Sequence, residues 1–203
     1  MLFIHRIWNW CKRFRHRCGY GVHSPSDFFL ITSVVYESLP YYAYRELKNR
    51  KYPSHLPHYR RKVNRLLFRL VNHFRPQAWM EIGPGNGAST DYMRAARTSM
   101  QTTTIDGREK EATLNTLRSM NPIDFLHIGF TPYYKEVLEE VLPHLSENAC
   151  IVVGGIYDSK EKRKWWKELQ KDERIHLSFD LYDIGLILFD KKRFKQHYVI
   201  NFL

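Results

Sequence analysis

Three glycines stand at alternate positions, Gly83, Gly85 and Gly87, directly after a short apolar run that carries an acidic residue, Glu81. Without Cβ atoms, such a backbone can turn tightly and approach a ligand closely. A helix-like segment follows, and its N-terminal amides and positive dipole end would point into the same space. The spacing differs from the G-x-G-x-x-G of dinucleotide sites. The stretch predicts a strand, a tight ligand-binding turn and a helix.

From residue 78 onward, strand-like and helix-like segments alternate. The predicted strands are 78–82, 102–106, 123–128 and 149–154, and the predicted helices are 87–98, 108–119, 132–143 and 159–171. Continuous apolar runs such as 151–153 suit strands that are covered on both faces. The alternation predicts an α/β fold with a doubly wound, mostly parallel, Rossmann-like sheet.

The C-terminal part does not follow this alternation of strands and helices. Two strand-like runs, 175–181 and 184–189, are separated by only two residues. So short a connection cannot cross over the sheet, and the pair is therefore predicted to be an antiparallel hairpin. A last short extended piece is expected at 197–202.

The positive charge of the chain is concentrated in its N-terminal third. The net charge is +11 over 203 residues, and residues 1–75 carry 15 Lys and Arg against three acids, a balance of +12. This asymmetry favours an anionic partner, which could be nucleic acid, lipid headgroups or an acidic substrate. A solvated basic face that only aids solubility is the alternative.

The first eighteen residues have the pattern of a basic amphipathic helix. Its apolar positions are Phe3, Ile7, Trp10, Cys11, Phe14 and Cys18. Arginines, a lysine and a histidine lie between them. The apolar stripe could dock on the rest of the protein, or lie on an anionic membrane or a partner.

Further helices are expected before the sheet begins. Ser24, Pro25 and Asp27 form a strong helix start, so a helix is predicted at 24–38. His23, just before this start, could contribute to a ligand pocket or serve a local hydrogen bond. Residues 40–58, rich in Tyr, Pro and His, predict a loop or broken helix whose aromatic side chains could stack on bases. A helix is predicted at 59–75.

Three cysteines, Cys11, Cys18 and Cys150, cannot all pair and form no C-x-x-C. Free thiols indicate a reducing compartment. No apolar stretch approaches the roughly 20 residues of a membrane span, and no secretory signal is recognised. The expected location is the cytoplasm, with peripheral membrane attachment as a variant.

Several motifs together resemble a known family. They are the Gly-Val-His-Ser-Pro segment at 21–25, the glycine turn at 81–87, Leu-Pro-His-Leu at 142–145 and the C-terminal run from 180 to 202. They are similar to small bacterial class I S-adenosylmethionine-dependent methyltransferases of the catechol O-methyltransferase type. The resemblance spans nearly the whole chain and implies a basic helical cap at 1–75 and a methyltransferase-like α/β domain at 76–203 that form one compact unit.

The resemblance also implies which residues contact the cofactor. In this family the acid at the end of the first strand and the glycines hold the amino-acid part of S-adenosylmethionine, and the acid after the second strand holds the ribose hydroxyls. The candidate cofactor-binding residues are Glu81, Gly83, Pro84, Gly85, Gly87, Asp106 and Gly129. A carboxylate can accept two hydroxyl hydrogen bonds at once.

The chain departs from the family in three places. One strand and helix are absent before 123–128, so the sheet should have one edge strand fewer. Gly129 stands where an Asp is usual, and Gly154 and Gly155 stand where a pair of Asp residues is usual. Hard divalent cations need several oxygen ligands, and only Asp158 is near. No catalytic metal is expected.

The catalytic residues are not assigned by the sequence. His127, Tyr157 and Asp158 could act as bases or orienting groups, or could be a core histidine, a packed tyrosine and a helix cap. His23 and the aromatic residues of 40–58 could form a lid. Methyl transfer from a sulfonium needs mainly alignment and sometimes a base. Three hypotheses stay open: an active methyltransferase, an inactive methyltransferase-like binding protein, and an adaptor that uses only the basic N-terminal third.

Overall fold

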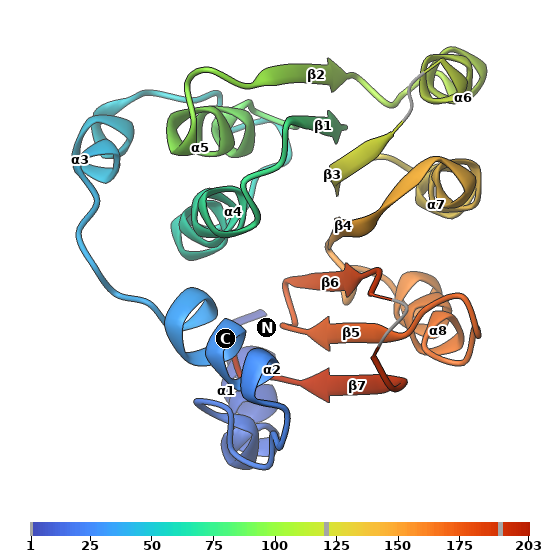
Figure 1. Ribbon diagram of the computed structural model, residues 1–203. Helices are drawn as coiled ribbons and strands as arrows, with labels where there is room; N and C mark the ends of the chain where they lie inside the picture. The colour runs from blue at the N-terminus through green and yellow to red at the C-terminus, as the bar shows by residue number, and fades with distance from the viewer. Residues whose placement is uncertain (1, 120–121, 191–192) are drawn as a thin grey trace.

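A seven-stranded mixed sheet forms the centre of the protein, with the strand order β2-β1-β3-β4-β6-β5-β7 (Figure 1). The computed structural model describes residues 2–119, 122–190 and 193–203. The strands are β1 (Ala78–Ile82), β2 (Gln101–Ile105), β3 (Ile123–Ile128), β4 (Leu145–Gly154), β5 (Leu177–Asp180), β6 (Ile184–Leu188) and β7 (Gln196–Val199). All of the strands predicted from the sequence are present.

The sheet is parallel in its first half and mixed in its second. Strands β2, β1, β3 and β4 run parallel, whereas β6 pairs antiparallel with both β4 and β5. The short connection between β5 and β6 holds the predicted hairpin together. These pairings confirm the predicted α/β class with a parallel Rossmann-like core that ends in an antiparallel hairpin.

One edge of the sheet agrees with the sequence-based expectation, and the other goes beyond it. Within the described residues no strand pairs beyond β2, which agrees with the expected loss of a strand at that edge. At the opposite edge, β7 pairs in parallel with β5, from Leu177 opposite Gln196 to Asp180 opposite Val199. The last extended piece is therefore a full member of the sheet.

Helices cover both faces of the sheet. The α-helices are α1 (Leu2–Lys12), α2 (Pro25–Leu30), α3 (Tyr42–Asn49), α4 (Arg61–Phe74), α5 (Ala88–Ala96), α6 (Lys110–Arg118), α7 (Tyr134–Val141) and α8 (Lys160–Leu169). Short helical turns lie at Phe14–His16 (η1), Ile31–Val35 (η2) and Leu142–His144 (η3). Figure 1 shows α4 and α5 on one face of the sheet and α6, α7 and α8 on the other.

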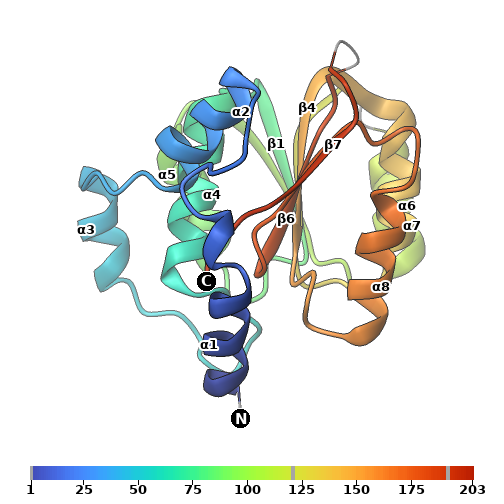
Figure 2. The ribbon, with the colours of Figure 1, turned by 90° about the horizontal axis from the view of Figure 1, so that it is seen from below.

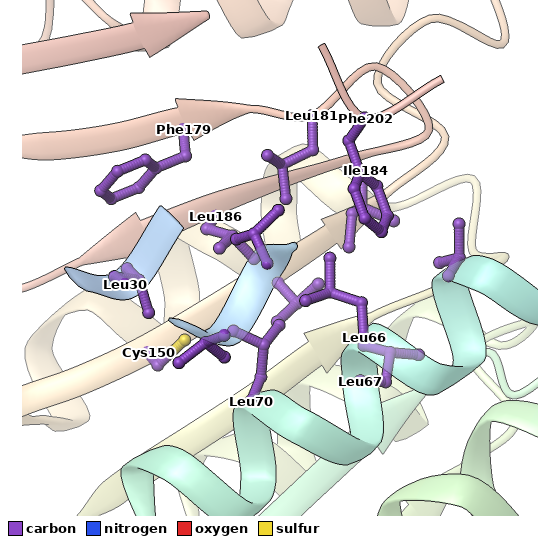
Figure 3. Close-up of a cluster of buried hydrophobic side chains, with 14 of the residues drawn as sticks. Leu30, Leu66, Leu67, Leu70, Cys150, Phe179, Leu181, Ile184, Leu186 and Phe202 are labelled. Carbon is purple, nitrogen blue, oxygen red and sulfur yellow. The ribbon is translucent and has the colours of Figure 1, made fainter. Parts of the chain in front are cut away.

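The larger part of the core lies between the sheet and the helices α2, η2 and α4 (Figure 3). The predicted inner face of α4 is buried there, including Leu66, Leu67 and Leu70. These leucines pack with Phe179 and Leu186 of the terminal hairpin. The N-terminal third is thus joined to the α/β part by one shared hydrophobic core.

The helix predicted at 24–38 changes from α-helical to π-helical geometry halfway. Residues Ile31–Val35 form a π-helical turn that continues α2. The buried Arg69 of α4 donates from Nε to the carbonyl of Val34 (2.6 Å) and from Nη2 to the carbonyl of Val35 (2.9 Å). The arginine thereby satisfies carbonyls at the end of the turn, which would otherwise be unpaired in the core.

Helix α1 docks on the protein through its arginines and not through its apolar stripe. Arg6 forms two hydrogen bonds with the carboxylate of Asp183 (2.7 and 2.9 Å), and the buried Arg13 pairs with Asp180 at 2.8 Å. Ile7 and Phe14, by contrast, are 49% and 54% exposed. Docking of the apolar stripe on the protein was therefore the wrong alternative; the side chain of Phe3 lies outside the described part.

All three cysteines are free; Cys11 and Cys18 are exposed and Cys150 is buried. Within residues 2–119, 122–190 and 193–203, none of the helices combines the length and the apolar character needed to cross a membrane.

Candidate functional site

The glycine turn joins the end of β1 to the start of α5. Gly83, Gly85 and Gly87 have φ angles of +70°, +64° and +85°, a region that side chains with a Cβ rarely occupy. The turn therefore requires glycine at these positions. It lies where α5 leads away to β2 on one side of β1, while β3 adjoins on the other. In open α/β sheets, ligands bind in the crevice at such a switch point.

Glu81 is fully buried and its carboxylate is engaged by the protein itself. Its Oε1 accepts a hydrogen bond from Ser89 Oγ (2.5 Å), its Oε2 accepts one from Thr90 Oγ1, and His127 Nδ1 lies 2.9 Å from Oε1. Ser89 and Thr90 belong to the first turn of α5. Three groups of the chain thus surround the carboxylate that was predicted to face the cofactor.

Tyr59 extends this network from the sheet toward the surface. Its hydroxyl lies 3.1 Å from His127 Nε2, and its ring stacks on Phe130 with a centroid distance of 4.5 Å. Burial raises the pKa of the Tyr59 hydroxyl well above its ordinary value, and the negative charges of Glu81 and Asp158 raise it further. The tyrosine hydroxyl is therefore neutral. A hydrogen-bonded series of side chains, Glu81, His127 and Tyr59, crosses the carboxyl edge of the sheet.

Residues 50–59, called the strap from here on, lie over the glycine turn. The carbonyl of Pro57 accepts a hydrogen bond from the amide of Asn86 (2.9 Å), and Tyr52 donates to Asp91 Oδ2 of α5 (2.9 Å). A Cβ added at Gly85 would lie only 2.2 Å from the Pro57 carbonyl and 2.6 Å from the Phe130 ring. The glycine is needed here for close packing against the chain's own strap.

The glycines at the ends of β3 and β4 also allow close packing. A Cβ at Gly129 would lie 2.4 Å from the Gly83 carbonyl, and one at Gly154 would lie 1.7 Å from the Tyr59 hydroxyl. Tyr59 thus occupies the space beside Gly154, where the resembled family has a carboxylate. The absence of the acid was visible in the sequence, but the side chain that takes its place was not.

Asp106, immediately after β2, lies in an open environment. Its side chain is 63% exposed and pairs with Arg108 Nε at 2.8 Å. An ion pair this exposed is weak and easily exchanged for another partner. The structure therefore brings together the glycine turn, Glu81 and His127, whereas Asp106 stands at the neighbouring strand tip with its carboxylate accessible.

The other candidate residues lie outside this network. Tyr157 donates to Asp180 Oδ2 (2.7 Å) and accepts from Arg13 Nη2 (2.7 Å), so it helps to attach α1. Asp158 is not the cap of α8, since Ser159 fills that role by accepting from the Lys162 amide. His23 lines a separate hollow of about 330 Å³ beside Asp27, near β7.

Ser89, Thr90, Tyr59 and Phe130 are the site residues that the sequence did not reveal. Tyr59 was expected at the start of a helix, but that helix begins at Arg61. Of the aromatic residues of 40–58 that could form a lid, Tyr52 lies in the strap and hydrogen-bonds to Asp91 of α5. The signal that could have indicated Tyr59 is Gly154, which leaves room for a neighbouring ring.

S-adenosylmethionine fits this site only in part. The exposed Asp106 and the open space at Gly87, where an added Cβ would meet no atom within 4 Å, suit the nucleoside end of the ligand. The amino-acid end does not fit, because Pro57 and Phe130 lie against Gly85 and the oxygens of Glu81 are engaged. The strap must move before this part of the cofactor can enter.

Within the described part of the chain, no group of three or more His, Cys, Asp or Glu side chains could hold a metal ion.

Several solved structures with the same fold are methyltransferases. The O-methyltransferase of Streptomyces achromogenes involved in tomaymycin synthesis, solved with S-adenosylmethionine, is 16% identical over 73% of this chain and 86% of its own, with a TM-score of 0.52. A methyltransferase from Geobacter sulfurreducens is 16% identical over 66% and 80%, with a TM-score of 0.53. An O-methyltransferase from Bacillus cereus, solved with S-adenosylhomocysteine (SAH), is 13% identical over 91% and 100%, with a TM-score of 0.50.

No family model matches the sequence, and no curated protein matches it. The likeness is therefore one of structure. The chain has the fold of the class I S-adenosylmethionine-dependent O-methyltransferases.

Proposed function

We propose that the protein is a methyltransferase-like protein that binds S-adenosylmethionine at the tips of β1 and β2 and transfers its methyl group to an acceptor without a catalytic metal. The observation that carries the proposal is the glycine turn at the switch point of the sheet, followed by the N-terminus of α5 and flanked by the accessible Asp106. Two of the similar structures were solved with S-adenosylmethionine or SAH, which supports the choice of ligand.

Asp106 would hold the ribose, because one carboxylate can accept hydrogen bonds from two neighbouring hydroxyls. Gly87, which has no Cβ, would let the ligand approach closely, and the N-terminus of α5 would offer a favourable dipole. Bound S-adenosylmethionine would supply an activated methyl group. Metal independence is supported by Gly154 and Gly155, which stand where the resembled family has acids. A cytoplasmic location belongs to the same proposal, and the free cysteines support it.

The second candidate function is a binding protein without turnover. It is favoured by the strap, which covers Gly85, and by the carboxylate of Glu81, which has three partners from the chain itself. In this case a ligand would bind at Asp106 while the strap stays over Gly85, and no methyl group would be transferred. The two candidates differ in whether the strap opens far enough for methyl transfer.

Isothermal titration calorimetry with S-adenosylmethionine and with SAH tests the proposal. We expect both ligands to bind wild-type protein, and Asp106→Ala to bind about tenfold more weakly after losing hydrogen bonds to the ribose. The half-buried Asp124, near the start of β3 and away from the carboxyl edge of the sheet, provides the control Asp124→Ala, which should bind like wild type. Absence of binding to wild type, or equal binding by Asp106→Ala, would refute the site.

A radiolabelled methyl assay then separates the two candidate functions. Protein that binds the cofactor is incubated with labelled S-adenosylmethionine and fractionated cell extracts. Label transferred to an extract component supports the transferase. Binding without transfer in every fraction supports the protein without turnover.

A further inference from the structure

Helix α1 and η1 present an apolar surface to solvent. The surface, called the α1 face from here on, consists of Ile4, Ile7, Trp8, Trp10 and Phe14, which are between 38% and 73% exposed. Figure 2 shows α1 at the border of the molecule, with its N-terminal end extending away from the other elements. Large apolar side chains gathered in this way mark an interaction site.

Helix α1 turns its arginines toward the protein, whereas an ordinary surface helix turns its apolar face inward. The polar residues Arg6 and Arg13 turn inward, to Asp183 and Asp180, and fix the orientation of the helix. The guanidinium of Arg13 also contacts the stacked rings of Tyr157 and Tyr182, at 5.0 and 5.2 Å from their centroids. Because these inward contacts attach the helix, its outward face is free to contact something else.

The α1 face is bordered by positive charge. Residues 1–26 contain five Lys and Arg and no Asp or Glu. Lys12 lies over the Trp8 ring at 5.0 Å, and Arg17 lies 5.6 Å from the centroids of both Trp10 and Phe14. The acids beneath the helix, Asp180 and Asp183, are already paired with Arg13 and Arg6.

A hollow next to this face has the same mixed character. It has a volume of about 350 Å³, and its lining combines Ile7, Trp10 and Leu203 with Arg6 and Arg60. Apolar walls beside guanidinium groups suit an acyl chain that carries an anionic headgroup.

We propose that the α1 face is a docking surface for an anionic lipid bilayer. Tryptophans among cationic side chains, on a helix with aliphatic residues beside them, are typical of helices that lie in the membrane interface. Ile4 and Ile7 gain from contact with acyl chains but have no stacking surface for bases, so lipid fits better than nucleic acid. Docking would place the basic N-terminal third against the bilayer. The proposal is independent of the cofactor site.

Vesicle binding tests this proposal. Full-length protein is sedimented with vesicles of phosphatidylcholine alone, or of phosphatidylcholine and phosphatidylglycerol in equal parts. We expect binding to the anionic vesicles that weakens with added salt. Loss of apolar burial in Ile4→Ser with Trp8→Ser should weaken binding about tenfold or more. Charge reversal in Arg15→Glu with Arg17→Glu should also abolish the preference for anionic vesicles. Phe194→Ser, which changes a side chain 90% exposed elsewhere, is the matched control.

A fluorescent label reports where the helix goes. In the Cys18→Ser variant, Cys11 is the exposed thiol and Cys150 is buried, where burial raises the pKa of its thiol and keeps it unreactive. An environment-sensitive dye at Cys11 should shift to shorter wavelengths when anionic vesicles are added.

The opposite results overturn the proposal. They are no vesicle binding, equal binding to neutral and anionic vesicles, or binding that the α1-face variants leave unchanged. If Ile4→Ser with Trp8→Ser instead dissociates a dimer in analytical ultracentrifugation, the α1 face joins two copies of the chain. If it abolishes salt-sensitive binding of duplex DNA but not of vesicles, the partner is nucleic acid.

Discussion

Strands β1 and β2 lie side by side and each has an acid near its carboxyl end, yet the two acids have opposite surroundings. Glu81 is fully buried with Ser89, Thr90 and His127 around it, whereas the Asp106 side chain is 63% exposed. The position at a strand tip is therefore not sufficient to make an acid a ligand. An acid at a strand tip is available to a ligand only if neighbouring segments have not already filled its hydrogen-bonding capacity. Here α5 and β3 supply the partners of Glu81, whereas Asp106 pairs with the exposed Arg108 next to it.

The largest expected effect is on stability at Glu81. Glu81→Ala would leave His127, Ser89 and Thr90 without their buried partner, and should lower the free energy of unfolding by about 3 kcal/mol or more. Asp106→Ala removes an exposed side chain and should change it by less than about 0.5 kcal/mol. Urea denaturation of both variants measures the contrast. Similar values for the two would contradict the environments described for these acids.

The next effect concerns the two glycines that frame the turn. Gly87→Ala should cost about 1 kcal/mol, because its φ of +85° disfavours a Cβ but the added atom meets nothing. Gly85→Ala should cost at least about 2 kcal/mol, because the added atom also collides with the Pro57 carbonyl. Thermal and urea unfolding give both numbers. Equal costs would mean that the strap does not lie on Gly85.

A smaller effect is expected for the hydroxyl of Tyr59. Tyr59→Phe loses one hydrogen bond to His127 and should be less stable by about 1 kcal/mol at neutral pH. The pKa of Tyr59 is raised above its ordinary value of 10.0 in the folded protein. As the pH rises past 10.0, the Tyr59 hydroxyl loses its proton in the unfolded chain before it does so in the folded protein. The wild type therefore loses stability with rising pH, and Tyr59→Phe, which has no such proton, does not.

The stability difference between wild type and Tyr59→Phe should therefore narrow above about pH 10. Denaturation at a series of pH values measures it. The same direction of change is expected for Tyr41→Phe outside the strap, because burial and the hydrogen bond to Glu37 also raise the pKa of Tyr41. A difference that grows above pH 10 would contradict the buried position of the Tyr59 hydroxyl.

Much of the fold could be predicted from local patterns. Strands β1 and β3 have the predicted bounds, and Ser24 and Asp27 begin α2 as expected, because apolar periodicity and capping are encoded in neighbouring residues. The parallel pairing of β7 with β5 could not be predicted in the same way. It joins residues that are about twenty positions apart, and nothing in Gln196–Val199 itself specifies the partner.

The candidate site was predictable only in outline. The glycine turn and its helix follow from residues 81–90, but the strap comes from residues 50–59, which have no regular period. Helix α1 gives the same lesson from the other direction. Its amphipathic pattern was correct, but the pattern cannot tell which face turns inward, because ion pairs of Arg6 and Arg13 with Asp183 and Asp180 outweigh the apolar stripe.

The most direct test of the account compares the affinity of wild-type protein and of Tyr59→Ala for S-adenosylmethionine by calorimetry. If the strap covers the glycine turn and must open, removing the Tyr59 ring should raise the fraction of open protein and tighten binding about tenfold, since apparent affinity scales with that fraction. Tyr42→Ala, at a side chain 92% exposed on α3, should bind like wild type. Tighter binding by Tyr59→Ala alone is the predicted result. Unchanged or weaker binding by a folded Tyr59→Ala, or no binding by either protein, would contradict a cofactor site beneath the strap.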